Sequence, residues 1–488
     1  MYLIGIDVGT THTKIGMYRP NGEELFFRKF YTPFDRIKDG GELSGEVLIG
    51  AILERLKEGY GRLPFLKNEK GFLGISSLGE TIIPVSYDNN TLSYGLIWYD
   101  RRTIPIYDEI ITKIGKEYFI KNLLKNPGYF YSLNKILWFK NKNPALFEKT
   151  KWFLPISSYI AFTLTGDTCI DYSHAVRTML FNPYNMDWDY KLMNKLGLSP
   201  GMFPPLCKSG TLLGKLTPKI KDELGIVEDV YVSSGGHDHL VAALYMGLFY
   251  KNILFNSSGT TESVFLGVGN KELKNPDIYL FLENGDITCH TIFGLYTAIT
   301  SMGTGGVAFK WFFENLLRQD ISYAYSLKYK ENNLFFMPRL LEVHEDRPSS
   351  AFLYVSMDDD MDTLYSSLVE SLVFELVDRT RFLQIMEDEI PSIMRVSGGP
   401  SENNLYNQLK SDLFEKNVEI PQNKEATLLG AALLGGIGGN IYRNYEEAHM
   451  GVYRVKEVFA PNKNPYLTEK FQKYRELKKD YDGFLLDH

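Results

Sequence analysis

The chain has 488 residues, of which 44% are hydrophobic and 23% are charged, and its formal net charge is −7. This mixture is typical of globular proteins and excludes a disordered chain, a collagen-like chain and a disulfide scaffold. At roughly 150 residues per domain, the length predicts two to four domains. A mildly acidic chain has no global electrostatic reason to bind nucleic acid, so we expect no such partner.

The cysteines and the N-terminal residues indicate the cellular compartment of the protein. Cys169, Cys207 and Cys289 are too few and too scattered for a disulfide framework, and their spacing does not fit a CxxC zinc site. The N-terminal segment has no basic region and carries the acidic Asp7, unlike a secretory signal. No run approaches the ~20 apolar residues of a membrane helix. We therefore expect a cytoplasmic protein with no membrane partner.

The first part of the chain alternates between strand and helix patterns. Residues 2–9 read as a strand, a Gly-Thr-Thr turn follows, and a second strand ends at Asn21-Gly22, a strong turn signal. Residues 45–60 have helical spacing of apolar positions, and 71–77 read as a short buried strand. This alternation predicts an α/β sheet layered with helices. Residues from about 105 to 205 are helical, aromatic and rich in proline, and we expect an insertion there.

A second alternating section begins near Val230, where an apolar strand meets Gly235-Gly236 and then a helix. A helix rich in small residues is expected to pack closely on its neighbours, and a charged amphipathic helix at the C-terminus is expected to present its Lys and Arg side chains to solvent. The further elements predicted are a strand–turn–strand unit at 252–269, a long helix near 362–388, a strand at 394–400, a helix at 403–414, the small-residue helix at 426–439 and the C-terminal helix at 470–484.

The turn sequence Gly9-Thr10-Thr11 recurs as Gly259-Thr260-Thr261, displaced by 250 residues. Each copy lies between two apolar, strand-like runs. Three identical residues also arise by chance, but the matched context on both sides favours duplication of a half-chain unit.

Such a turn exposes backbone N–H groups and two hydroxyls, which can approach phosphate oxygens without a clash. Asp7 precedes the first turn and would suit a Mg²⁺ ion carried by a nucleotide, while Lys14 on the second strand can face a transferred phosphoryl group. The first turn alone is equally compatible with a plain hairpin and a buried, satisfied aspartate. The chain has neither a GxxxxGK[ST] loop nor a GxGxxG motif after a strand, so a dinucleotide-binding interpretation is weak.

His237-Asp238-His239 allows three interpretations. As a metal site it has suitable residue types, but no further Cys/His cluster completes the ligand set. As a structural turn, the aspartate would cap the helix that follows. As a catalytic site, a carboxylate at a strand end after Gly-Gly can orient a substrate hydroxyl and accept its proton.

Five segments in this order resemble the FGGY carbohydrate kinase family: GIDVGTT, IWYDRR, GGHDH, SGTTES and SGGPSENN. The resemblance extends over nearly the whole chain and includes members such as xylulokinases, glycerol kinases and fuculokinases. It implies an α/β fold of two actin-like (ribonuclease H-like) lobes with an ATP cleft between them. The implied division is a sugar-binding lobe at 1–240, which contains the helical insertion, and a nucleotide-binding lobe at 241–488.

The resemblance also implies roles for individual residues. Asp238 matches the catalytic base, Asp7 the acidic position near Mg²⁺, and Glu80, Trp98 and His239 match substrate contacts. The positions matched to ATP binding are Gly9, Thr10, Thr11 and Lys14 in the first turn, Gly259 and Thr260 in the second, Gly303, Gly305 and Gly306 further on, and Gly398, Gly399 and Asn403 near the nucleoside. Without the family, Trp98 reads as a packing aromatic, Glu80 as a surface carboxylate and Asn403 as a helix cap.

The sequence departs from the family on the substrate side and in the second phosphate loop. Thr261-Glu262 replaces the Ser-Gly that many members have there, and an acidic residue near phosphate would repel it unless it points away or binds the metal. Leu78-Gly79-Glu80 and His237 match neither the xylulokinase nor the glycerol kinase pattern well.

We therefore predict an ATP- and Mg²⁺-dependent kinase of carbohydrate metabolism that phosphorylates a hydroxyl of a small sugar, ketose, polyol or sugar acid. The alternatives are another phosphotransferase of the actin-like superfamily, and a catalytically silent regulator that binds ATP or sugar. A homodimer is a common outcome for kinases of this family.

Overall fold

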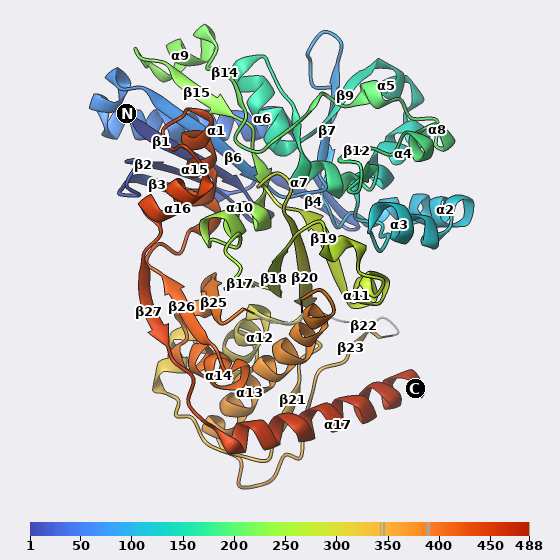
Figure 1. Cartoon of the computed structure of the whole chain (residues 1–488), viewed down its shortest axis with the longest axis vertical. Helices are drawn as coiled ribbons and strands as arrows, with labels where there is room; N and C mark the ends of the chain where they lie inside the picture. The colour runs from blue at the N-terminus through green and yellow to red at the C-terminus, as the bar shows by residue number, and fades with distance from the viewer. Residues whose placement is uncertain (342, 345–346, 388–390, 488) are drawn as a thin grey trace. The chain divides into compact units, whose positions relative to one another are not determined.

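A computed structural model describes residues 1–341, 343–344, 347–387 and 391–487 of the chain. The residues group into two compact units, each with its own large sheet (Figure 1). The first unit comprises Met1–Phe249, Asp286–Thr297 and Glu425–Tyr453, and the second comprises Tyr250–Gly285, Ala298–Lys424 and Arg454–His488. The expected mixed α/β fold is confirmed. The sequence-based division at residue 240 assumed two continuous halves, whereas the compact units are assembled from separated segments.

The first unit is organised around a seven-stranded sheet with the order β14-β15-β6-β1-β2-β3, in which β16 pairs with the end of β6. Strand β1 is antiparallel to β2 and parallel to β6. Both β1 and β6 are buried along their whole length, which explains why they read as apolar runs without alternation. The strands are β1 (Tyr2–Val8), β2 (His12–Tyr18), β3 (Glu24–Tyr31), β6 (Gly71–Ser77), β14 (Leu212–Lys215), β15 (Val230–Ser233) and β16 (Gly236–His237).

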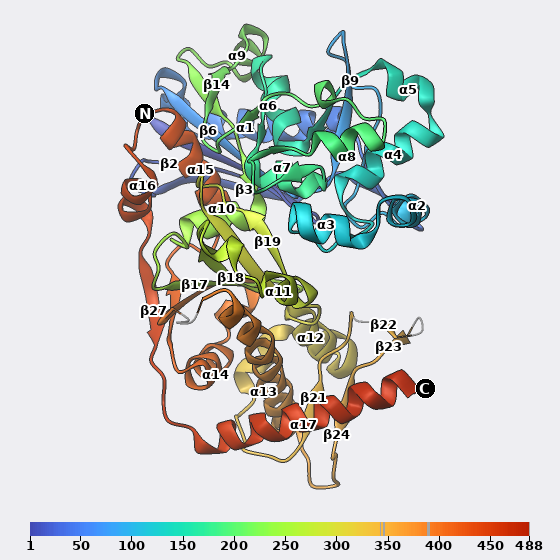
Figure 2. The same ribbon diagram turned by 45° about the vertical axis from the view of Figure 1, so that its right-hand side comes forward.

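Helices of the first unit cover this sheet and form the insertion. Helix α1 begins after Ser44, whose hydroxyl accepts a hydrogen bond from the backbone N–H of Val47, and it buries Leu48, Ile52 and Leu56 of the predicted apolar positions, whereas Val47 is 56% exposed. The inserted helices α2–α5 and α8 gather together in both Figure 1 and Figure 2, as expected for the region 105–205. The helices are α1 (Gly45–Arg62), α2 (Ile104–Ile114), α3 (Lys116–Leu123), α4 (Ser132–Lys142), α5 (Pro144–Lys149), α6 (Ile156–Thr165), α7 (Tyr172–Ala175), α8 (Tyr190–Lys195), α9 (Pro218–Leu224), α10 (Asp238–Tyr245), α15 (Ala426–Gly438) and α16 (Tyr445–Val452).

Helix α15 comes from late in the chain and packs on β1, β6 and α10. A Cβ atom at Gly74 of β6 would lie 2.0 Å from the carbonyl oxygen of Ala431, so the helix approaches the sheet more closely than any side chain would allow. The close packing predicted from the small residues of this helix is therefore confirmed.

The second unit contains a seven-stranded sheet with the order β19-β20-β18-β17-β25-β26-β27. Strand β17 is antiparallel to β18 and parallel to β25, which repeats the relation of β1 to β2 and β6. The two Gly-Thr-Thr turns thus join equivalent strands of two similarly ordered sheets, as duplication predicts. The strands are β17 (Ile253–Ser258), β18 (Glu262–Val268), β19 (Gly285–Cys289), β20 (Tyr296–Met302), β25 (Ile393–Ser397), β26 (Asn417–Pro421) and β27 (Val455–Phe459).

The C-terminal helix α17 (Pro465–Asp487) packs on α13 (Met361–Thr380), and its Lys473, Arg475 and Lys479 are exposed, as expected, whereas two further lysines pair with α13. Lys470 Nζ lies 2.6 Å from Glu370 Oε2, and Lys478 Nζ lies 2.6 Å from Glu375 Oε2. Lys470 is buried and Lys478 is 14% exposed, because α13 presents carboxylates that no periodicity within α17 reveals. The other helices of the second unit are α11 (Ile278–Asn284), α12 (Gly306–Lys310), which continues as a π-helical segment at Trp311–Leu317, and α14 (Asn404–Phe414).

Short strands and turns complete the fold. The small sheets pair β4 (Phe34–Ile37), β5 (Gly40–Leu43) and β8 (Gly95–Leu96); β7 (Ile82–Ser86) and β9 (Thr150–Pro155); β10 (Ile170–Asp171) and β13 (Leu206–Cys207); β11 (Phe181–Asn182) and β12 (Asp187–Trp188); β21 (Phe335–Met337) and β24 (Ala351–Leu353); and β22 (Val343–His344) and β23 (Arg347–Pro348). Single 3₁₀ turns lie at Pro64–Asn68, Arg101–Thr103, Val176–Thr178, Pro200–Met202, Glu272–Lys274, Ile321–Ser326, Arg381–Ile385 and Gly399–Glu402.

Cys169 and Cys207 form a disulfide, with their Cα atoms 5.9 Å apart. No disulfide framework was expected from the number and spacing of the cysteines, and a separation of 38 residues carries no signal for this pair. The pairing arises because β10 and β13 lie side by side in parallel, which only the fold determines. Cys289 is buried outside any disulfide.

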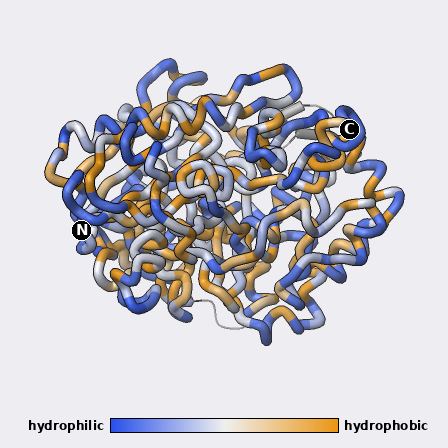
Figure 3. The backbone as a smooth tube through the Cα atoms, turned by 90° about the horizontal axis from the view of Figure 1, so that it is seen from above, coloured by the Kyte–Doolittle hydropathy of each residue, from blue (hydrophilic) through white to orange (hydrophobic). Residues whose placement is uncertain are grey.

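Hydrophobic and hydrophilic stretches alternate throughout the chain (Figure 3). Among the described helices, none is long and apolar enough to cross a membrane.

Candidate active site

The carboxyl ends of three parallel strands meet in the first unit. Across the sheet, Lys14 is in register with Asp7, Asp7 with Ser76, and Ser76 with Gly236. The chain leaves β16 directly into α10, so Asp238 starts that helix at the same edge of the sheet. Ligands of open α/β sheets bind at this edge, and here it collects the predicted metal, phosphoryl and base positions.

Asp7 is buried and lies close to other charged side chains. Its burial raises its pKa to about 7, even though Lys14 acts in the opposite direction. Lys14 Nζ lies 3.9 Å from Asp7 Oδ2 and 2.6 Å from Glu425 Oε2, just before helix α15. Asp7 Oδ1 is buried without a hydrogen-bond partner among the described residues. A buried carboxylate oxygen with this unmet capacity suits a cation or an ordered water.

Asp238 occupies the first turn of α10, where the helix dipole favours a negative charge. Its Oδ1 accepts a 2.7 Å hydrogen bond from the backbone N–H of His239 and lies 3.5 Å from His237 Nε2. The contacts with His237, His239 and the backbone N–H of His239 are all made by Oδ1, and Oδ2 takes part in none of them. Burial raises the pKa of this carboxyl above its usual range, which makes the carboxylate a stronger base.

The histidines around Asp238 have different surroundings. The side chain of His237 is only 12% exposed, and this partial burial together with the positive charge of Arg177 holds its pKa well below the usual range. His239 is partly exposed, and its Nε2 lies 3.9 Å from Asp238 Oδ1. The described residues contain no group of three or more His, Cys, Asp or Glu side chains that could hold a metal ion.

A further histidine, His174, lies behind this site and was missed in the sequence. Its Nδ1 lies 2.6 Å from Asp171 Oδ2 and its Nε2 lies 3.1 Å from the hydroxyl of Ser77. The backbone N–H of His237 donates to the hydroxyl of Ser173, in the same helix α7. The buried His174 therefore ties α7 to the end of β6 and supports the segment that carries Asp238.

Glu80 is buried, not a surface carboxylate as its isolated sequence context suggests. Its Oε1 accepts hydrogen bonds from Nε and Nη2 of Arg177. Arg177 Nη1 also lies 2.7 Å from Asp286 Oδ2. A Cβ atom on Gly79 would lie 2.9 Å from His237 Nε2 and 3.4 Å from Arg177 Cγ, which places Glu80, Arg177 and His237 around one point.

Trp98 connects a predicted substrate contact with the first phosphate turn. Its indole Nε1 donates a 3.0 Å hydrogen bond to the hydroxyl oxygen of Thr10. The turn itself is closed by the N–H of Gly9, which donates to the carbonyl of His12, and Thr11 at its tip is exposed. Trp98 is 38% exposed, so its ring is not simply a core residue.

The second Gly-Thr-Thr turn lies in the second unit against the predicted glycine segments. The N–H of Gly306 donates a 2.7 Å hydrogen bond to the carbonyl of Gly259, and the N–H of Gly305 donates to the carbonyl of Thr260. Gly398 has φ +109°, and a Cβ atom there would lie 2.0 Å from the carbonyl oxygen of Ser258. Only glycine fits at Gly398. Two segments distant in sequence, at 305–306 and at 398, therefore converge on this turn.

Glu262, which was unassigned in the sequence, points into the core of the second unit. Its Oε1 lies 2.5 Å from Lys410 Nζ, and its Oε2 accepts a 2.6 Å hydrogen bond from the hydroxyl of Tyr406. Both Glu262 and Lys410 have fully buried side chains. The carboxylate is thus committed to a buried ion pair, which removes the expected repulsion of phosphate.

The remaining positions matched to ATP binding, Gly303, Gly399 and Asn403, have no contact within the described residues that points to a nucleotide. Gly303 directly follows β20, and a Cβ atom on Gly399 would meet nothing within 4 Å. Asn403 caps α14 through a hydrogen bond from the N–H of Tyr406 to its Oδ1, and its Nδ2 donates to the hydroxyl of Tyr365. Capping by Asn403 agrees with the interpretation made without the family. Its contact with a nucleoside stays a prediction.

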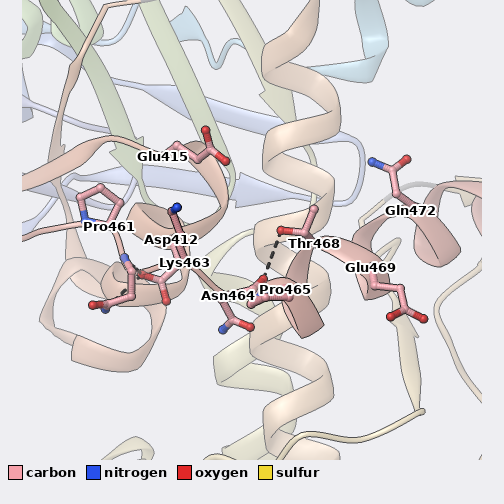
Figure 4. Close-up of a pocket in the computed structure, with 10 residues that line it drawn as sticks. Asp412, Glu415, Pro461, Lys463, Asn464, Pro465, Thr468, Glu469 and Gln472 are labelled. Carbon is pink, nitrogen blue, oxygen red and sulfur yellow. Dashed lines mark hydrogen bonds between the residues drawn. The ribbon is translucent and has the colours of Figure 1, made fainter.

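A separate pocket of about 690 Å³ opens near the start of α17 and the end of α14 (Figure 4). It is lined by polar and charged side chains such as Asp412, Lys463 and Glu469, and Figure 4 shows Thr468 hydrogen-bonded to the backbone of Asn464. None of its lining residues belongs to the predicted site.

Two charged residues of the candidate site, Glu425 and Arg177, were not predicted from the sequence. Glu425 is 411 residues from Lys14. Arg177 lies within the insertion, where proline and aromatic content drew attention to packing. The only local signal was a charged residue in an otherwise apolar stretch, VRTMLF, which is a weak indication.

Residues 2–245 match the N-terminal domain, and residues 254–439 the C-terminal domain, of the FGGY family of carbohydrate kinases. The chain belongs to this family and is an ATP-dependent sugar kinase. It is 25% identical to a xylulose kinase from Bacillus subtilis, over 98% of this chain and 95% of that protein. It is 26% identical to a glycerol kinase from Borreliella afzelii, over 98% of each chain. The solved structure of Plasmodium falciparum glycerol kinase with ADP superposes with a TM-score of 0.86 at 19% identity, covering 99% of this chain and 97% of that chain, which shows a shared fold.

Proposed function

We propose that this kinase transfers the γ-phosphoryl group of ATP to a hydroxyl of a small sugar, ketose or polyol, with Asp238 as the general base. The observation that carries this proposal is the placement of Asp238 at the sheet edge that also holds Asp7 and Lys14. There, one oxygen of Asp238 is held by the backbone of His239 and the other is left for a hydroxyl. Family membership and the xylulose and glycerol kinases among its relatives support the same class of acceptor.

In this proposal each residue has one task. Asp238 accepts the proton of the acceptor hydroxyl as its oxygen attacks phosphorus, and the bond from the γ-phosphorus to the bridging oxygen of ADP breaks. Lys14 and the N–H groups of the first Gly-Thr-Thr turn stabilise charge on the transferred oxygens. Glu80 and Trp98 orient the acceptor, together with His239.

The unpartnered Oδ1 of Asp7 fits the Mg²⁺ ion expected with ATP. A carboxylate is the ligand type that Mg²⁺ prefers, and Asp7 would hold the ion directly or through water. When bound, the ion supplies neutralisation of the phosphate charge. Lys14 lies beside Asp7 and keeps a positive charge, because Asp7 and Glu425 hold its pKa above the usual range despite its burial.

The glycine segments of the second unit are proposed to hold the nucleotide. Gly259, Thr260, Gly306 and Gly398 lie around one turn, where backbone N–H groups can approach phosphate closely. The division into substrate binding by 1–240 and nucleotide binding by 241–488 stays a prediction, as do cytoplasmic location and homodimer formation.

Asp238→Asn tests the proposal, because it preserves the shape and the helix-start position of the side chain but removes its basicity. We expect ATP binding to be retained within about twofold and acceptor-dependent ADP release to fall at least 10³-fold, since an activated nucleophile is lost. Asp229→Asn, a carboxylate-to-amide change at the opposite end of the same sheet, is the matched control.

Turnover of Asp238→Asn equal to that of the unmodified enzyme, with any acceptor in a panel of ketoses and polyols, would refute Asp238 as the base. If the unmodified enzyme released ADP with no member of the panel, the assigned acceptor class would be refuted instead.

A further inference from the structure

The acceptor side of the site contains a buried chain of alternating charges that the proposed chemistry does not use. Arg177 lies between Glu80 and Asp286, and Lys125 Nζ lies 2.6 Å from the other oxygen of Asp286, Oδ1. The guanidinium also lies over the ring of Tyr131, 5.0 Å from its centroid. Lys125 is almost completely buried, whereas the side chain of Asp286 is 28% exposed.

Of the two cations in this series of alternating charges, Arg177 and Lys125, Arg177 is the one that contacts a predicted substrate residue. It touches Glu80 directly, and its charge contributes to the lowered pKa of His237, the neighbour of Asp238. An arginine so placed is the usual device for binding a carboxylate, because its planar fork matches two carboxylate oxygens. Here, however, three of the five N–H groups of Arg177 are already used, because Nε and Nη2 donate to Glu80 and Nη1 donates to Asp286.

The lysines near Arg177 that the structure describes also have hydrogen-bond or ion-pair partners within the protein. Lys125 donates to Asp286 and to the carbonyl of Ile287, and Lys135 donates to the carbonyls of Trp98 and Phe130. Both lysines are buried, so they cannot reach an acceptor at the surface of the site. Lys14 pairs with Glu425 on the phosphoryl side.

We propose that Asp286 is a specificity-determining residue, which cancels the charge of Arg177 so that the kinase accepts neutral polyols and ketoses and rejects sugar acids. A carboxylate entering beside Glu80 would meet that carboxylate, Asp286 and Asp238 without an uncommitted cation among the described residues. A neutral acceptor meets the second oxygen of Glu80, Oε2, which can accept hydroxyl hydrogen bonds. Arg177 is in this view a positioning residue that orients Glu80.

This inference rests on the proposed function, and its test separates the two. With the unmodified enzyme, kcat/KM is measured with ATP and Mg²⁺ at pH 8 for neutral acceptors, such as xylulose, glycerol and ribitol, and for aldonates of three to six carbons. We expect neutral acceptors to exceed the matching aldonates by at least about 100-fold, because a desolvated charge without a partner is strongly disfavoured. An aldonate as good as the best neutral acceptor would overturn the inference while leaving the phosphotransfer function intact.

Asp286→Asn then tests the residue itself. Freeing Arg177 from one carboxylate should shift the ratio of aldonate to neutral kcat/KM about 10- to 100-fold toward the acid, mainly through KM for the aldonate. A merely structural role would lower both activities together and leave the ratio unchanged, and that result would overturn the assignment of Asp286. Asp229→Asn, which makes the same chemical change at the exposed ion pair with Lys215, should leave the ratio within twofold.

Failure of the proposed function has a different signature. In that case neither class of acceptor stimulates ADP release, and the ratio is not defined for any variant. Arg177→Lys, which keeps the charge but loses the fork, gives a second reading. This variant should raise KM for neutral acceptors, because Glu80 is misplaced, and should change kcat less. A variant with a lower kcat and an unchanged KM would contradict the positioning role of Arg177.

Discussion

The indole Nε1 of Trp98 donates a 3.0 Å hydrogen bond to Oγ1 of Thr10. This contact joins a residue expected to touch the acceptor with the turn expected to touch phosphate, across 88 positions of the chain. Because Trp98 is partly exposed and Lys135 also donates to its carbonyl oxygen, the ring is held at the edge of the site by its own backbone and by the turn.

Removal of this hydrogen bond should affect catalysis more than stability. We expect Trp98→Phe to lower kcat/KM for the acceptor about 5- to 13-fold, since one hydrogen bond is worth roughly 1–1.5 kcal/mol, while the melting temperature changes little. Thr10→Ser keeps the acceptor oxygen and should retain most activity, whereas Thr10→Val should resemble Trp98→Phe. Trp152→Phe, at a half-buried tryptophan in β9, is the control. Additive effects in the double variant Trp98→Phe/Thr10→Val would contradict the coupling.

Asp7 should cost the protein stability in the absence of ligands. Burial raises its pKa to about 7 from an ordinary value near 3.8, so the native state binds this proton more tightly than the unfolded state does. The penalty is absent below about pH 4, grows as the pH rises and is complete above about pH 7. Asp7→Asn should therefore stabilise the ligand-free protein by about 2–4 kcal/mol at pH 8 and by little at pH 4, while abolishing turnover.

Denaturant unfolding at several pH values measures this effect, with the exposed Asp35→Asn as the control for a change of net charge. If the stabilisation by Asp7→Asn did not grow between pH 4 and pH 8, the ionised Asp7 carboxylate would not be the source of the stability penalty.

The buried pair of Glu262 and Lys410 should behave asymmetrically. We expect Lys410→Met to destabilise the protein by about 3–5 kcal/mol, because it leaves Glu262 charged and buried without its main partner. Replacing both residues by Glu262→Leu and Lys410→Met should recover much of this loss. Thermal and chemical unfolding measure both variants, with Lys473→Met at an exposed ion pair as the control. A double variant that is as unstable as the sum of its single variants would argue against the pair acting as a unit.

The disulfide between Cys169 and Cys207 should contribute measurably when formed. It closes a loop of 38 residues, for which chain entropy predicts roughly 3–4 kcal/mol of stabilisation. Thiol titration of the denatured, unreduced protein should find one reactive thiol, that of Cys289, and three after reduction. Three thiols without a reductant would show that the pair is reduced in the isolated protein. Reduction should lower the unfolding midpoint, and Cys289→Ser should not change that difference.

Local patterns were sufficient for many elements of the fold. The strands β1 and β6, the helix α1 and the hairpin at the first Gly-Thr-Thr turn were predicted because apolar spacing and turn residues act within a few positions. The same holds for the Asp238 segment, where Gly-Gly, a charged tripeptide and an apolar helix follow one another. The second turn was found by its identity with the first.

The missed features share a physical cause. The pairing of Lys470 and Lys478 in α17 was missed because Glu370 and Glu375 lie on another helix, and the disulfide was missed because it depends on the pairing of two very short strands. Glu262 looked like an obstacle to phosphate until its burial against Lys410 was known.

The sequence by itself determined the class of this protein, its mixed α/β elements and the residue types at the proposed centre, because those depend on short motifs in a fixed order. Only the tertiary structure decided which charges meet. The pairing of Lys14 with Glu425, and of Arg177 with Glu80 and Asp286, brings together segments separated by about 100 to 400 residues. Charge interactions depend on distance in space and on burial, and neither can be read from separation along the chain.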